Sequence, residues 1–168
     1  GLYSCMEFSD EESTPSFVDP AIRLADGTLF TRTLLLESFG ECIVGELKNF
    51  KEKSSAFAKA ASEAASNQSK KDAAKKAWED AIDSWQQLEL MQVGPAGRST
   101  EPGGKALRDK SIYAWPKRKH CEIDRHLISE AYSLDESSLK DGEKGLEAAE
   151  YLLFNSRKEN SCESGDDI

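Results

Sequence analysis

Apolar residues recur at helical spacing from about residue 31 onward. One set repeats every seven positions and consists of Leu36, Ile43, Phe50 and Phe57. Residues seven apart lie on one face of a helix, so this stripe predicts a long amphipathic helix that runs to about Ala65. The polar residues Asn67 to Ser69 then offer a break.

A second helix is predicted for about residues 70–93, because Gly94-Pro95 is a typical helix end. Four of its residues occupy the a and d positions of a heptad: Trp78, Ala81, Trp85 and Leu88. That spacing is typical of a helix that packs against a partner helix. We therefore expect both tryptophans to be buried against the Leu36, Ile43 and Phe50 stripe of the first helix.

The second half of the chain contains shorter helical patterns. A Gly- and Pro-containing connection spans residues 94–111, and Pro116 prevents ordinary helix continuation. Ile123 and Leu127 suggest a short helix, and a turn at residues 141–145 leads into a last helix. The pattern has long helices, short breaks and no strand-like alternation, so it predicts an all-α, up-down bundle of about four helices.

Three segments follow from the pattern. Residues 1–28 have little periodicity and are expected to be an extended or disordered lead-in. Residues 29–155 form the helical bundle. Residues 156–168 are polar and acidic, and are expected to be a tail or linker.

Charge and cysteine content narrow the function classes. The net charge of −9 argues against nucleic acid as a partner, because phosphate binding requires clustered Lys and Arg. No apolar run is long enough for a membrane-spanning helix.

The four cysteines have no C-x-x-C spacing, which argues against zinc. In an oxidising compartment they can form one or two disulfides, and three connectivities remain open. These cysteines are Cys5, Cys42, Cys121 and Cys162.

The last helix carries the most informative polar residues. Glu147 and Glu150 are the two charged side chains in a segment that is otherwise apolar, and three-residue spacing places them on one face. Two nearby carboxylates repel each other unless a cation, a proton or a basic residue joins them. Hard cations such as iron, calcium and magnesium prefer carboxylate oxygen. The alternative is that the pair forms the solvated stripe of this helix.

A second group of metal-type side chains lies at residues 120–126. It consists of His120, Cys121, Glu122, Asp124 and His126. The two histidines are six positions apart, which does not align them on a helix. We interpret this stretch as a charged surface loop rather than a metal site.

Three sequence elements together resemble a known family. Trp85, Glu89 and Gly94-Pro95 match a helix that ends in E-x-x-x-x-G-P. The next two elements are Ile112 through Trp115-Pro116 with Ile123-Asp124, and the run Gly145 to Phe154. The last of these is similar to a G-x-H-x-x-E motif with an apolar run behind it. In order and spacing, residues 30–155 resemble the first half of imelysin-like proteins.

The chain departs from the family pattern in two ways. Glu147 replaces the histidine of the motif, whereas Glu150 matches its carboxylate. The replacement puts a site built on His and Glu in doubt, but carboxylate is itself a ligand for hard cations. Family members resemble two bundles in tandem with the site where the halves meet, and this chain covers the first.

The resemblance implies an extracytoplasmic binding protein of bacterial iron or haem uptake, in the periplasm or cell envelope. Its cation ligands would be Glu147, Glu150 and Glu89, and the cation would be iron or another hard divalent ion. The expected partners are a metal ion or haem-related ligand, and a second imelysin-like half or partner protein. Leu2-Tyr3-Ser4-Cys5 loosely resembles a lipobox, so membrane contact at the outer membrane would come from a lipoprotein anchor near Cys5.

Two alternatives belong to other classes. The first is a metallopeptidase of the imelysin type, which needs a bound metal that activates water and a carboxylate as general base. The second is a partner-binding helical bundle that holds no metal. No catalytic residue and no organic cofactor is assigned.

Overall fold

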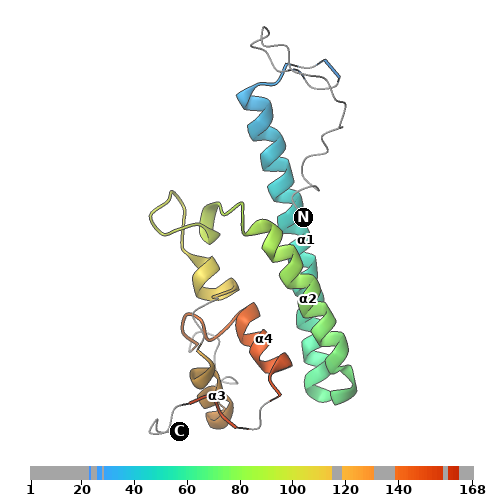
Figure 1. The fold of residues 1–168 in the computed structure, drawn as a ribbon, viewed down its shortest axis with the longest axis vertical. Coiled ribbons are helices and arrows are strands. Elements are labelled where there is room, and N and C mark those ends of the chain that lie inside the picture. The colour runs from blue at the N-terminus through green and yellow to red at the C-terminus, as the bar shows by residue number, and fades with distance from the viewer. Residues whose placement is uncertain are drawn as a thin grey trace.

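A computed structural model describes residues 23, 26–27, 29–114, 119–130, 139–156 and 159–162. Its helices in chain order are α1 (Arg32–Ser66), η2 (Gln68–Lys70), α2 (Lys71–Leu88), η3 (Gly94–Ala96), the π-helix η4 (Arg108–Ile112), α3 (His120–Ser129) and α4 (Leu146–Phe154) (Figure 1). Within these residues the one β contact is an isolated bridge between Arg23 and Leu29. The prediction of an all-α helical bundle is confirmed. Most of the predicted lead-in, and Trp115-Pro116, lie outside the described residues.

Helices α1 and α2 form an antiparallel hairpin along most of the molecule (Figure 1). The Thr31 hydroxyl accepts a hydrogen bond from the Leu34 amide (3.1 Å) and caps the start of α1. At the other end the Asn67 amide donates to the Glu63 carbonyl, and its side chain accepts from the Ser69 amide. These local caps explain why the ends of α1 that the sequence predicts, at about residues 31 and 65, each lie within one residue of the observed ends.

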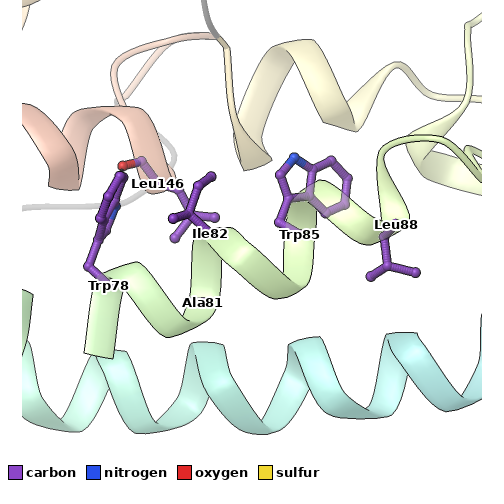
Figure 2. Packing of buried hydrophobic residues seen from close by; sticks show 6 residues of the cluster. All are labelled: Trp78, Ala81, Ile82, Trp85, Leu88 and Leu146. Carbon is purple, nitrogen blue, oxygen red and sulfur yellow. The ribbon is translucent and has the colours of Figure 1, made fainter. Parts of the chain in front are cut away.

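The core lies between α2, the lower half of α1 and α4. Trp78 and Trp85 are 8% and 2% exposed, so the predicted burial of both tryptophans is confirmed. The rings of Trp85 and Phe50 lie 5.3 Å apart between centroids. Trp78 Nε1 donates to the Leu146 carbonyl (2.8 Å) and joins the first residue of α4 to α2 (Figure 2).

The predicted packing of the whole α1 stripe is wrong at its N-terminal end. Leu36 is 59% exposed, and three neighbouring apolar side chains are also exposed: Phe39, Val44 and Leu47. The physical reason is length, because α1 has 35 residues and α2 has 18. Helix α2 ends at Leu88, five residues before the predicted end, so the upper half of α1 extends past it (Figure 1).

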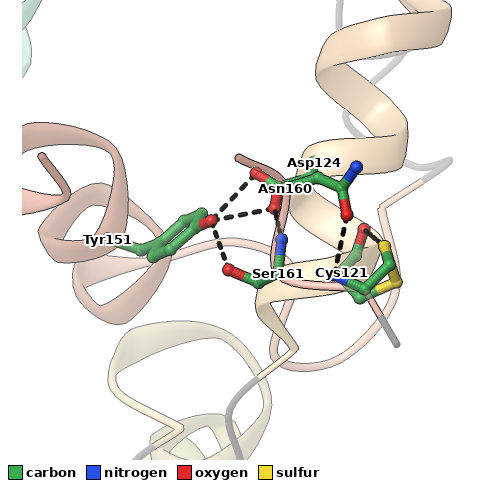
Figure 3. The surroundings of a disulfide bond; sticks show 6 residues. Cys121, Asp124, Tyr151, Asn160 and Ser161 are labelled. Carbon is green, nitrogen blue, oxygen red and sulfur yellow. Dashed lines mark hydrogen bonds between the residues drawn. A yellow bond between two sulfur atoms is a disulfide. The ribbon is translucent and has the colours of Figure 1, made fainter. Parts of the chain in front are cut away.

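Helix α3 corrects a second expectation. The short helix predicted around Ile123 and Leu127 is confirmed, whereas the interpretation of residues 120–126 as a surface loop is wrong, because they are helical and Ile123 is buried. Asp124 faces α4 and accepts hydrogen bonds from the Tyr151 hydroxyl (2.8 Å) and the Ser161 amide (2.7 Å) (Figure 3). Asp124 of this stretch is therefore used in helix packing.

A disulfide joins Cys121 of α3 to Cys162 (Figure 3). Cys42 is disulfide-bonded as well, and none of the cysteines in the described part of the chain is a free thiol. Residues 161–162, within the predicted tail, are thus attached to α3. None of the described helices is both long and apolar enough to cross a membrane.

Candidate functional site

Gly145 fixes the position of the motif helix α4. It precedes Leu146 with a φ of 93°, a conformation that L side chains rarely adopt. A Cβ here would lie 2.3 Å from the Ser111 carbonyl oxygen and 2.7 Å from that of Ile112. Glycine therefore lets the start of α4 press against the end of η4. This contact gives a physical reason for the glycine that opens the motif.

Glu147 and Glu150 project from the first two turns of α4. The Glu147 residue is only 4% exposed, and Glu150 is partly buried. A carboxylate loses hydration when it is buried, so such a residue needs compensating interactions. The solvated-stripe alternative does not describe Glu147, because that stripe would leave it in water.

Tyr113 brings the predicted ligands into one neighbourhood. Its hydroxyl donates a hydrogen bond to Glu150 Oε2 (3.2 Å). Burial, followed by the negative charge of Glu150, raises the pKa of Tyr113 to about 12, and the charges of Glu147 and Glu89 add to the effect. All three predicted glutamates thus act electrostatically on one phenol.

The π-helix η4 supplies the groups that contact two of these glutamates. Arg108, its first residue, places Nε 3.0 Å from Oε1 of Glu89, which follows the last residue of α2. Tyr113 follows its last residue, and the Tyr113 amide donates to the Arg108 carbonyl (3.0 Å). Single π-turns are frequent at functional sites. Here one wide turn presents a guanidinium to Glu89 and a phenol to Glu150.

The donor chemistry suits a hard cation, but the described residues do not form a closed metal centre. Carboxylate and phenol oxygens are ligands for iron, calcium and magnesium. Among the described residues, however, no three His, Cys, Asp or Glu side chains are grouped so that they could hold one ion. Glu89, Glu147 and Glu150 therefore make an acidic neighbourhood in which Arg108 and Tyr113 already contact two members.

Both histidines of the chain contact residues outside this neighbourhood. His126 Nε2 lies 2.9 Å from Glu143 Oε2, and the ring of His120 stacks on Tyr151 with 4.0 Å between centroids. Burial raises the pKa of Glu143, but the Lys140 amide, His126 and Lys119 outweigh it and lower the pKa overall. Glu143 is almost fully buried and anchors the turn before α4 to α3. The two histidines of the group at residues 120–126 thus make packing contacts with Glu143 and Tyr151.

Trp85 adds a buried polar atom to the same region. Its Nε1 donor is buried and has no hydrogen-bond acceptor in the described part of the chain. Leaving such a donor unpaired costs roughly 1–3 kcal/mol. The indole packs 5.3 Å from the ring of Phe50 of α1, and in Figure 2 it also projects from α2 toward the side where η4 lies.

Sequence reasoning missed Arg108 and Tyr113. Tyr113 lies inside the Ile112 to Trp115-Pro116 element, so its place beside a family feature was a usable signal. Arg108 lies in a connection rich in Gly and Pro and carries no such signal. Its partner Glu89 is distant in sequence, so only the tertiary fold reveals the pair.

Comparison with known proteins gives one finding. Residues 43–166, well over half of the chain, match the family model described as imelysin, a peptidase family. The match includes α4 with its altered motif and the η4 segment that faces it. No curated protein matches the chain, and no solved structure matches it.

Proposed function

The chain belongs to the imelysin family, and we propose that it acts as a binding protein of bacterial iron or haem uptake. In this proposal Glu147 and Glu150 hold a hard divalent cation, with Glu89 as a further ligand. The observation that carries the proposal is the burial of Glu147 on the motif helix, close to Glu150. Two carboxylates held in a partly enclosed space repel each other, and a shared cation relieves that repulsion.

The cysteines support an extracytoplasmic location for this function. Disulfides such as Cys121–Cys162 persist in oxidising compartments and are rare in the cytosol. We therefore place the protein in the periplasm or cell envelope. Fractionation that finds the native protein in the cytosol with reduced cysteines would contradict this location.

The exposed half of α1 supports a protein partner. Its apolar side chains continue the face that α2 covers lower down. A second imelysin-like half is the partner that we propose for this face. Replacing Leu36 and Leu47 with glutamate should abolish its capture in a pull-down and leave the helix content unchanged. Unchanged capture would exclude the face as the contact.

A metallopeptidase is the second candidate, because the family that the chain matches is described as a peptidase family. Such sites use histidine to hold the metal. Neither histidine lies in the acidic neighbourhood, because His120 stacks on Tyr151 and His126 contacts Glu143. A bundle that binds partners without metal is the third candidate, and the lack of a three-ligand group in the described residues favours it.

One experiment separates the three candidates. Protein purified without chelator is analysed for metal, titrated calorimetrically with Mn²⁺ and Fe²⁺, and assayed for peptide cleavage. We expect binding without cleavage, and loss of binding in the Glu147→Gln, Glu150→Gln variant. The matched control is Glu37→Gln, Glu41→Gln, which removes two exposed carboxylates from α1. Metal-dependent cleavage would favour the peptidase, and no metal binding would favour the partner-binding bundle.

A further inference from the structure

A groove lies between α3, α4 and residues 159–160, with a cavity volume of about 290 Å³. None of the residues that line it belongs to the acidic neighbourhood of Glu89, Glu147 and Glu150. In Figure 1, α3 lies at the end of the molecule away from the exposed half of α1. The groove is therefore a separate surface from both the candidate cation site and the exposed face of α1.

Three aliphatic side chains that line this groove are exposed. Leu127 and Ile128 of α3 are 44% and 61% exposed, and Leu152 of α4 is 45% exposed. Single apolar residues on a surface are normal, but several around one hollow are typical of a binding site. These side chains give a partner apolar surface to bury.

The groove is held in shape by contacts that join its three segments. Asp124 Oδ2 accepts hydrogen bonds from the Tyr151 hydroxyl (2.8 Å) and the Ser161 amide (2.7 Å) (Figure 3). A disulfide joins Cys162 to α3. These contacts fix residues 159–160 beside the two helices, and a preformed groove loses less conformational entropy when a partner binds.

The charge around the groove is negative. Asp124 and Glu159 line it, and no basic side chain does so among the described residues. Asp124 is engaged by Tyr151 and Ser161, whereas Glu159 is exposed. A partner with Lys or Arg beside its apolar residues therefore complements the groove, and an acidic partner is repelled.

We propose that this groove binds a basic amphipathic segment of a partner protein. Its aliphatic side chains pack against Leu127, Ile128 and Leu152, and a neighbouring Lys or Arg pairs with Glu159. The inference goes beyond the proposed function and does not depend on it, because the groove shares no residue with the acidic neighbourhood.

The test measures binding of two fluorescein-labelled peptides to the full chain by fluorescence anisotropy. One peptide is an amphipathic helix of Leu and Lys, and the other has Glu in place of each Lys. We expect the basic peptide to bind and the acidic peptide not to bind. Ile128→Ser, Leu152→Ser should weaken binding of the basic peptide about tenfold, because it removes apolar contact area. Both side chains are exposed, so this variant should keep its helix content.

Matched variants control for the other apolar face and for net charge. Leu36→Ser, Leu47→Ser changes two exposed residues of α1 and should bind the basic peptide like the unmodified protein. Glu159→Lys should weaken binding at least about threefold, because it places a positive charge where the peptide is basic. Glu37→Lys alters the net charge equally at an exposed position of α1 and should change the affinity by less.

The disulfide gives a further readout. Cys121→Ser, Cys162→Ser should also weaken binding, because residues 159–160 are no longer fixed to α3. No binding of the basic peptide, equal affinity for both peptides, or an equal loss in the groove and α1 variants would overturn the inference. Sedimentation that shows dimers of the unmodified chain and monomers of Ile128→Ser, Leu152→Ser would also overturn it, because a second copy would then occupy the groove. Each of these results leaves the proposed cation site standing.

Discussion

At Tyr113, burial and negative charge act in the same direction, because both disfavour the phenolate. The pKa is raised from 10.0 to about 12. A raised folded-state pKa means that the neutral phenol stabilises the fold fully below about pH 10. That contribution is lost as the pH rises through about 12. Tyr113 is thus locked as a hydrogen-bond donor to Glu150 at every physiological pH.

This ionisation is measurable by tyrosinate absorbance. The difference between the titrations of the unmodified protein and Tyr113→Phe isolates one phenol, which should titrate near pH 12. Circular dichroism along the titration must show that the fold persists over the range used. A difference curve centred near pH 10 would mean that Tyr113 does not face the three carboxylates.

The same residues show what sequence could and could not predict at this scale. Glu147 and Glu150 were found because helical periodicity places residues three apart on one face. The burial of Glu147 depends on tertiary packing around α4, and the Arg108–Glu89 pair joins segments distant along the chain. Pairs of this kind are not encoded by local spacing.

Among the elements, α4 depends on its close contact with η4. Gly145→Ala should destabilise the protein by about 2–4 kcal/mol, since the new methyl meets two backbone carbonyls at a positive φ. Gly45→Ala is the control, because Gly45 is exposed in α1 with nothing within 4 Å of the added methyl. That change should stabilise by about 0.5–1 kcal/mol. Urea unfolding that gives both variants the same sign would contradict this contact.

Helix α2 gives a prediction about the core. Trp85→Ala should cost roughly 3–5 kcal/mol in free energy of unfolding, because Trp85 is buried against Phe50. Leu36→Ala, on the exposed part of α1, should change it by no more than about 0.5 kcal/mol. Chemical denaturation measures both values. A similar loss for the two variants would mean that α2 covers more of α1 than the structure indicates.

The limits of the elements were predictable where a local cap sets them. The Thr31 side chain caps the start of α1 and the Asn67 backbone amide caps its end, so both ends follow from nearby residues. The end of α2 and the π-turn η4 were not predicted. A short helix around Ile123 was predicted from its apolar residues. The charged residues at 120–126 were interpreted as a surface loop, yet Asp124 and His126 make tertiary contacts.

In the whole molecule, the hairpin of α1 and α2 is a scaffold against which α4 packs, and α3 packs against α4 (Figure 1). Heptad spacing predicted the hairpin, because it reports which faces pair. It could not predict where α2 ends. Because α2 is short, α1 extends beyond it and leaves Leu36 and its neighbours exposed. The acidic neighbourhood lies where α2, η4 and α4 meet, so it depends on all three elements.

The central claim is that the carboxylates of α4 hold a cation, and locating the ion tests it most directly. Crystals grown with Mn²⁺ and measured at a wavelength that excites its anomalous scattering would place the ion without assumptions about ligands. We predict an anomalous peak between Glu147 and Glu150. A peak elsewhere, or no peak in crystals in which Glu147 remains buried, would contradict the claim.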